Sequence, residues 1–88
     1  MAQHPVHDPR YQVLAQMLGD LRRERGLLQQ DVADRLNRPQ AFVSKYESGV
    51  RRLDMVEFLD VVAALGADPS QLLKQFIAQA DKTKTARR

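Results

Sequence analysis

The stretch QQDVADRLNRPQAFVSKYE, residues Gln29–Glu47, decides the fold of this chain. Apolar residues recur at three- and four-residue steps in each half of it, which predicts two short helices over 29–36 and 39–47. Asn37 lies between them, and Asn tolerates a left-handed backbone better than most residues other than glycine. Pro39 disfavours helical geometry at the residue before it and suits the first position of a helix. The sequence therefore predicts two helices joined by a tight turn.

Packing of two such helices requires a small residue where they cross and apolar anchors on the second helix. Ala33 supplies the small residue, and Val43 and Tyr46 supply the anchors, with Phe42 beside them. Because the turn and both packing requirements are met at compatible spacings, we predict a helix-turn-helix. The alternative is an ordinary five-helix bundle that contains a tight turn.

The rest of the chain predicts three further helices and no strand. These helices are expected over 10–25, 55–65 and 70–79. Asp54 and Glu57 match a capping box at the start of the 55–65 helix. The face of that helix expected to turn inward carries Val56, Leu59, Val62 and Ala63. We therefore predict an all-α fold, a compact five-helix domain.

The chain divides into three parts. We expect a loose N-terminal arm over 1–9, a folded domain over 10–79 and a disordered basic tail over 80–88, because prolines break the first part and the last has no periodicity. His4 and His7 lie on the arm, with no further ligand held in place beside them. We therefore predict no metal site and no cofactor.

Composition limits the class of protein. A chain of 88 residues with 43% hydrophobic and 28% charged residues is typical of one small globular domain. Cysteine is absent, which excludes disulfides and is compatible with the cytosol. The apolar run Val61–Leu65 is too short to span a bilayer, and the first ten residues lack the apolar stretch of a signal peptide. We expect a cytoplasmic protein that does not bind a membrane.

Charge is grouped along the chain, whose net charge is +3. Cations dominate 22–25 and 38–52, whereas 53–69 contains acids and no cation. This grouping predicts one positive face, suited to a polyanion, and one negative face. A solvated surface of mixed charge is the alternative.

Three segments together resemble the Cro/lambda-repressor-type helix-turn-helix family, also called the xenobiotic-response-element family. They are LGDLRRERGLLQQDVADRL (18–36), FVSKYESG (42–49) and LDMVEFLDVVAALGADPSQLL (53–73). The resemblance implies a five-helix domain that binds duplex DNA, usually as a dimer, and regulates transcription. The chain departs from the family pattern at Leu28, where Ser or Thr is common and where an N-cap acceptor is missing at a cost of about 1 kcal/mol. Asn37 replaces a common Gly, and Pro39 a common Ser or Thr.

The 39–47 helix is expected to lie in the major groove of DNA. Its outward residues, the expected base contacts, are Gln40, Ala41, Ser44 and Lys45. For Ser44 and Lys45, a contact to phosphate is the alternative. The amide of Gln40 can pair with adenine N6 and N7, and the methyl of Ala41 suits a thymine methyl. A solvated helix face is the alternative.

A second set of residues is expected to hold the DNA backbone. It consists of Gln29, Arg38, Arg51 and Arg52. Gln29 matches the family position that contacts phosphate, and the three arginines flank the reading helix. Glu47 matches the family's half-buried acid, for which we predict an ion pair with Arg22 or Arg23.

The 70–79 helix carries an apolar stripe wider than one small domain needs to bury. Its members are Leu72, Leu73, Phe76 and Ile77. An exposed apolar stripe indicates a partner surface, so we expect a two-fold homodimer through this helix. Closure of the monomer's own core is the alternative.

The leading hypothesis is a sequence-specific, double-stranded DNA-binding transcriptional regulator, repressor-like and bacterial or from a phage. A phage repressor, a restriction controller and an antitoxin with a protein partner all fit. The competing hypothesis is a protein-interaction domain of the same fold that has lost DNA binding. We do not expect an enzyme, because the chain has no cysteine, no Gly-rich phosphate loop and no paired-carboxylate cleft.

Overall fold

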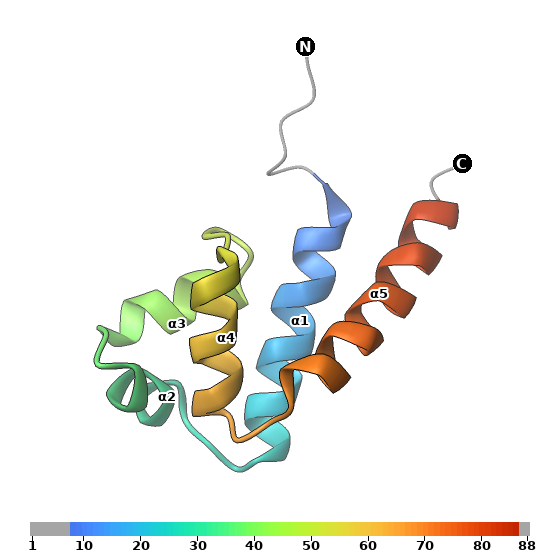
Figure 1. The fold of residues 1–88 in the computed structure, drawn as a ribbon. Coiled ribbons are helices and arrows are strands. Elements are labelled where there is room, and N and C mark those ends of the chain that lie inside the picture. Colours follow the sequence, from blue (N-terminus) through green and yellow to red (C-terminus); the bar gives the residue numbers. More distant parts are fainter. Residues whose placement is uncertain (1–7, 87–88) are drawn as a thin grey trace.

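Five helices make up the computed structural model, which describes residues 8–86 and shows no strand among them (Figure 1). They are α1 (Pro9–Glu24), α2 (Gln29–Leu36), α3 (Gln40–Glu47), α4 (Met55–Ala64) and α5 (Pro69–Ala86). In Figure 1, α1 and α5 run side by side, α2 and α3 form the opposite part of the molecule, and α4 lies between. The predicted all-α, five-helix class is confirmed.

One apolar core joins all five helices. Its buried members are Leu18, Val32, Ala33, Phe42, Val43, Tyr46, Phe58, Val61, Val62, Leu65 and Leu72. Ala33 and Val43 are fully buried where α2 packs on α3, and Tyr46 is 3% exposed. Burying each large apolar side chain stabilises the fold by about 1.5–3 kcal/mol. The predicted seating of the second helix of the pair on the first is confirmed.

The turn between α2 and α3 has the geometry predicted for it. Asn37 adopts a left-handed backbone, with φ of 58° and ψ of 44°. The Arg38 N–H donates to the Ala33 carbonyl at 3.0 Å, which satisfies a carbonyl at the end of α2. α2 begins without a side-chain cap from Leu28, as expected, but the Asp31 carboxylate accepts from the Leu28 N–H at 2.8 Å. Of the two hydrogen bonds of a capping box, the one from the N-cap N–H to the Asp31 carboxylate is therefore present, and the one that needs a side-chain acceptor at residue 28 is missing.

The inward face of α4 differs from the one we predicted. Val62 is buried as expected, but Val56 and Leu59 are 68% and 45% exposed, and Ala63 is also exposed. Phe58 and Val61 fill the core in their place. Because α4 is apolar around most of its circumference, its periodicity allows two inward faces. The face that carries Phe58 is the one that packs into the core. The opposite face of α4 is left as an exposed apolar stripe.

Both ends of the folded part differ from the predicted bounds. α1 begins at Pro9, and the Asp8 carboxylate accepts from the Arg10 N–H at 3.0 Å, so these residues do not belong to a loose arm. α5 continues to Ala86, well beyond Gln79, which corrects the disordered tail predicted from residue 80. Ala80 is buried at 7% exposure where α5 packs along α1, and each residue added to a helix gains one backbone hydrogen bond. His4 and His7 lie outside the described residues.

The described residues are also expected to contain no membrane span. Within residues 8–86, none of the helices combines the length and apolar character needed to cross a membrane. The described residues also contain no group of three His, Asp or Glu side chains placed to hold a metal ion.

Candidate nucleic-acid interface

A buried ion pair ties α3 to α1. Arg22 donates from Nε to Glu47 Oε2 at 2.6 Å and from Nη2 to Glu47 Oε1 at 3.0 Å, and the two side chains are 10% and 8% exposed. Its Nη1 donates to the Leu27 carbonyl at 2.7 Å. The hydrogen bond to Glu47 raises the pKa of Arg22 above its ordinary value. Of the two partners predicted for Glu47, the structure selects Arg22, while Arg23 pairs with Asp20 at 3.0 Å on the surface.

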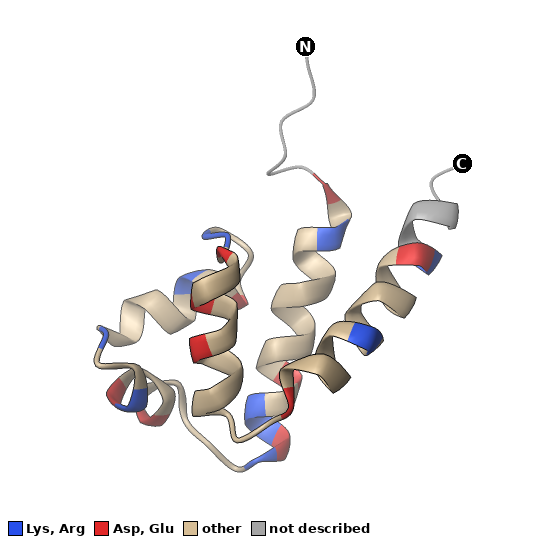
Figure 2. Ribbon diagram, in the orientation of Figure 1, with Lys and Arg blue, Asp and Glu red and all other residues tan. Residues whose placement is uncertain are grey.

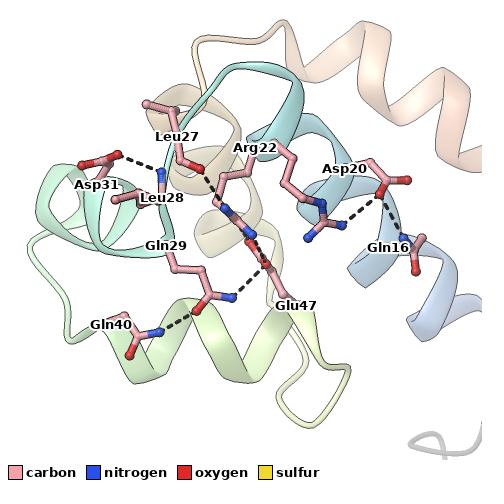
Figure 3. Close-up of polar contacts among 10 residues, drawn as sticks. Gln16, Asp20, Arg22, Leu27, Leu28, Gln29, Asp31, Gln40 and Glu47 are labelled. Carbon is pink, nitrogen blue, oxygen red and sulfur yellow. Dashed lines mark hydrogen bonds and ion pairs between the residues drawn. The ribbon is translucent and has the colours of Figure 1, made fainter.

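A chain of hydrogen bonds runs from this pair to the start of α3 (Figure 3). Gln29 donates from Nε2 to Glu47 Oε1 at 3.0 Å, and Gln40 donates from Nε2 to Gln29 Oε1. A carboxylate only accepts, so the NH₂ group of Gln29 must face Glu47 and its oxygen must face Gln40. Gln40 in turn must present its NH₂ group to Gln29. The buried ion pair therefore sets the orientation of an exposed amide at the tip of α3.

The outward face of α3 is available for contact. Gln40, Ala41 and Lys45 are exposed, and Ser44 is half-buried. Val43 and Tyr46 occupy the opposite side, which packs into the core. The structure thus brings the four predicted base-contact residues together on one face of one helix.

Arg38 and Arg51, which are predicted to contact phosphate, both bind Glu57. The sequence predicted Glu57 only as part of a helix cap. Glu57 accepts from Arg51 Nη1 and Nη2 at 3.0 and 2.8 Å and from Arg38 Nη2 at 3.3 Å. The two guanidinium groups also lie 4.2 Å (Arg38) and 4.9 Å (Arg51) from the ring centroid of Phe42. We call these four residues the Phe42 cluster. It flanks α3, since Arg38 precedes that helix and Arg51 follows it.

Glu57 carries the most perturbed carboxyl of this region. The Arg51 hydrogen bonds, assisted by the Asp54 N–H and by Arg38, lower the pKa of Glu57 to about 2. The same carboxylate completes the predicted capping box of α4: it accepts from the Asp54 N–H at 3.0 Å, and Asp54 accepts from the Glu57 N–H at 2.7 Å. The capping pattern was visible in the sequence, but the ion pairs depend on where the loop before α4 places Arg51.

The other two predicted phosphate residues lie apart from this cluster. Gln29 belongs to the hydrogen-bond chain described above. Arg52 is exposed, with its guanidinium 5.5 Å from the ring centroid of Tyr11 on α1. The four residues predicted to contact the DNA backbone therefore do not form a single cluster.

The predicted division into one positive and one negative face is wrong. Figure 2 shows acidic and basic segments mixed over the described residues, and Glu57 of the acidic block lies among the arginines beside α3. Two further arginines serve the end of α4: Arg25 donates to the Gly66 carbonyl at 2.8 Å and Arg35 to the Ala64 carbonyl at 2.7 Å. Grouping along the sequence did not become grouping in space, because ion pairs and helix-end carbonyls recruit cations from separate helices.

The stripe predicted on α5 is only partly exposed. Leu72 is 6% exposed and belongs to the core, so its assignment to a dimer interface is wrong. Leu73 and Ile77 are 39% and 50% exposed. Phe76 is half-buried and lines, with Ile77, an open groove of about 400 Å³ between α1 and α5. Leu72 turns inward because the start of α5 must cover the core beside α4.

Comparison with known proteins places this geometry in a family. Residues 13–74 match the family described as a helix-turn-helix domain. An XRE-family-like protein from Pseudomonas syringae pv. tomato str. DC3000 is 44% identical, with a TM-score of 0.77 over 84% of this chain and 90% of that one. The restriction-modification controller C.AhdI from Aeromonas hydrophila is 29% identical, with a TM-score of 0.66 over 70% of this chain and 94% of that one.

A second restriction-modification controller shows the same fold at a lower sequence identity. C.Esp1396I, solved as a tetramer in complex with its natural 35 base-pair operator, is 18% identical, with a TM-score of 0.74 over 81% of this chain and 93% of that one. No curated protein sequence matches the chain. The extent of the family match and the identity to the Pseudomonas protein are decisive: this chain belongs to the XRE family of helix-turn-helix proteins.

Proposed function

We propose that this chain is a sequence-specific, double-stranded DNA-binding regulator of transcription, a repressor-like protein of the bacterial cytoplasm, with α3 as its reading helix. The observation that carries the proposal is the hydrogen-bond chain from Arg22 to Gln40. This hydrogen-bond chain holds the exposed amide of Gln40 in one orientation, which a helix face that contacts only solvent does not require. Two further findings support the proposal: the chain belongs to a helix-turn-helix family, and C.Esp1396I, which has the same fold, was solved in complex with its operator.

Gln40 is the proposed residue for direct readout of a base. One of its two N–H bonds is used by Gln29, which leaves one N–H and Oε1 free. A donor beside an acceptor matches adenine in the major groove, where N7 accepts and the N6 amino group donates. The neighbours Ala41, Ser44 and Lys45 extend the same face along the groove.

Gln29, Arg38, Arg51 and Arg52 are the proposed contacts to phosphate. The first N–H groups of α2 have no partner within the helix, and a helix N-terminus favours an anion. These contacts set affinity and register, whereas the α3 face sets sequence preference.

The proposed assembly is a two-fold homodimer. The exposed apolar residues that remain on α5 are Leu73 and Ile77, with half-buried Phe76, and α4 adds Met55 and Val56 at 63% and 68% exposure. A dimer would place two copies of α3 about 34 Å apart on a pseudo-palindromic site. Sedimentation that shows only monomer at micromolar concentration, with and without duplex DNA, would contradict the dimer.

Salt dependence of duplex binding tests the proposed function. Two or three charged phosphate contacts per protomer predict a slope of log K against log salt of about −2 to −3 per protomer. Fluorescence anisotropy of a labelled duplex between 50 and 200 mM salt measures it. A selection of bound duplexes from a random pool then supplies the preferred sequence. A protein that binds no duplex at low salt is not a DNA-binding regulator.

A further inference from the structure

We infer that Glu57 is a positioning residue of the DNA interface that limits sequence-independent DNA affinity, because it holds Arg38 and Arg51 against Phe42 and cancels one of their two charges. The inference rests on the proposed function. It concerns a residue that neither faces a base nor touches phosphate, and it assigns that residue an effect on DNA selectivity.

The geometry shows how one carboxylate controls two cations. Both oxygens of Glu57 accept from Arg51, and Oε2 also accepts from Arg38. Each guanidinium also lies over the same aromatic ring. Two contacts of different kinds fix each arginine, so the side chains are ordered before any DNA arrives.

Exposure shows which member of the cluster DNA can reach. The side chains of Arg38 and Arg51 are 43% and 38% exposed, whereas that of Glu57 is 14% exposed. A phosphate can therefore meet the guanidinium groups while the carboxylate stays behind them. Guanidinium has five N–H donors. Arg51 also donates from Nη1 to the Arg52 carbonyl at 2.8 Å, and the donors that neither Glu57 nor this carbonyl uses remain available to phosphate.

The charge balance gives the direction of the effect. The two arginines carry two positive charges, and Glu57 reduces the cluster to one. Binding to DNA of any sequence depends on the charge that replaces counterions at phosphate. Removal of the carboxylate charge should strengthen this component. Binding to the preferred site should gain less, because there the arginines must hold fixed positions and have lost the group that orders them.

Glu57→Gln is the test variant, because its amide oxygen can still accept from the Asp54 N–H and keep the cap of α4. Asp81→Asn is the matched control. It removes one negative charge from an exposed position near the far end of α5, and charges beyond about 10 Å are screened at 0.1 M salt. Thermal unfolding of both variants sets a temperature at which each is fully folded.

Anisotropy with a random duplex and with the selected duplex, over 50–200 mM salt, gives the result. For Glu57→Gln we expect random-duplex affinity to rise about five- to tenfold at 0.1 M salt, and the salt slope to steepen by about 0.9 per protomer. The ratio of selected to random affinity should fall. Asp81→Asn should change neither quantity by more than about twofold.

The outcomes separate this inference from the proposed function. If the unaltered protein binds duplex DNA with a steep salt slope but Glu57→Gln leaves slope and selectivity unchanged, Glu57 is only a helix cap and the inference fails. An equal loss of affinity for both duplexes with an unchanged slope leads to the same conclusion. If the unaltered protein binds no duplex, the proposed function itself fails.

Discussion

Replacing Glu47 by Gln isolates the value of the buried ion pair. The substitution keeps the size of the side chain, so no cavity forms, but it removes the charge that faces Arg22. It also places an NH₂ group where Arg22 or Gln29 now donates. Two donors would then face each other inside the protein.

The expected loss of stability follows from burial. With Arg22 only 10% exposed in its side chain, its guanidinium cannot reach water to recover what it loses. Removing one partner of a buried pair costs about 3–5 kcal/mol. Because Arg22 keeps its bond to the Leu27 carbonyl, we expect the lower end, about 3 kcal/mol. A domain of this size is stable by about 4–13 kcal/mol, so the change is large.

Urea unfolding followed by circular dichroism measures the change. The free energy of unfolding of Glu47→Gln should fall by about 3 kcal/mol with an unchanged dependence on denaturant. Asp20→Asn is the control: it breaks the Arg23–Asp20 pair, whose side chains are 55% and 56% exposed, so its effect on the free energy of unfolding should be far smaller than that of Glu47→Gln. The double variant Arg22→Met/Glu47→Gln leaves no buried charge unpaired and should recover part of the loss. A Glu47→Gln loss no larger than that of the control would refute the reasoning.

Four further variants or conditions give sharp expectations. Because the pKa of Glu57 is lowered from 4.5 to about 2, its stabilisation is complete above pH 4.5 and is lost as the pH falls toward 2; Glu57→Gln should flatten this part of the curve of unfolding free energy against pH. Gly19→Ala should stabilise the protein by about 0.5–1 kcal/mol in urea unfolding, since glycine is unfavourable inside a helix and the new methyl would come close only to the movable end of Arg23 at 3.2 Å, with Glu47 Oε1 at an ordinary contact distance of 3.5 Å; a loss of stability would show that the methyl disturbs the Glu47 ion pair. Gln40→Ala should reduce affinity for the selected duplex by about 1–3 kcal/mol and relax preference at one base position, and an equal loss on random duplex would contradict direct readout. Arg52→Ala should weaken binding to all duplexes alike and reduce the salt slope by about 1 per protomer, so a sequence-dependent effect would speak against a phosphate contact.

Local rules in the sequence were enough to predict the helix-turn-helix. Asn37 has a left-handed backbone because a tight turn requires one, and Ala33 is buried because helices cross there. The capping box of Asp54 and Glu57 forms as predicted, since it depends on residues three apart in one helix. Each of these features is determined within a few residues of chain, where periodicity and turn chemistry are informative.

Features that depend on which surfaces meet could not be predicted in the same way. α4 is apolar on two sides, so the sequence could not decide between burying Leu59 and burying Phe58. The role of Glu57 beside Arg38 and Arg51 requires three separate segments to converge on Phe42. The contact between Gln29 and Gln40 joins the starts of two helices, and neither glutamine signals it alone.

In the proposed DNA-reading role of α3, one carboxylate at its end and one beside it resolve a conflict that such a helix faces. A negative charge near phosphate weakens binding, yet ordered polar side chains need acceptors to hold them. Glu47 is the last residue of α3 and its side chain is buried, where it orients Gln40 through Gln29 while Arg22 offsets its charge. Glu57 is held back at the side of α3, with two arginines between it and the surface that DNA would approach. Each acid is therefore neutralised or covered before it can repel DNA. On this reasoning, rigidity of the reading face and a low background of sequence-independent binding come from the same pair of side chains.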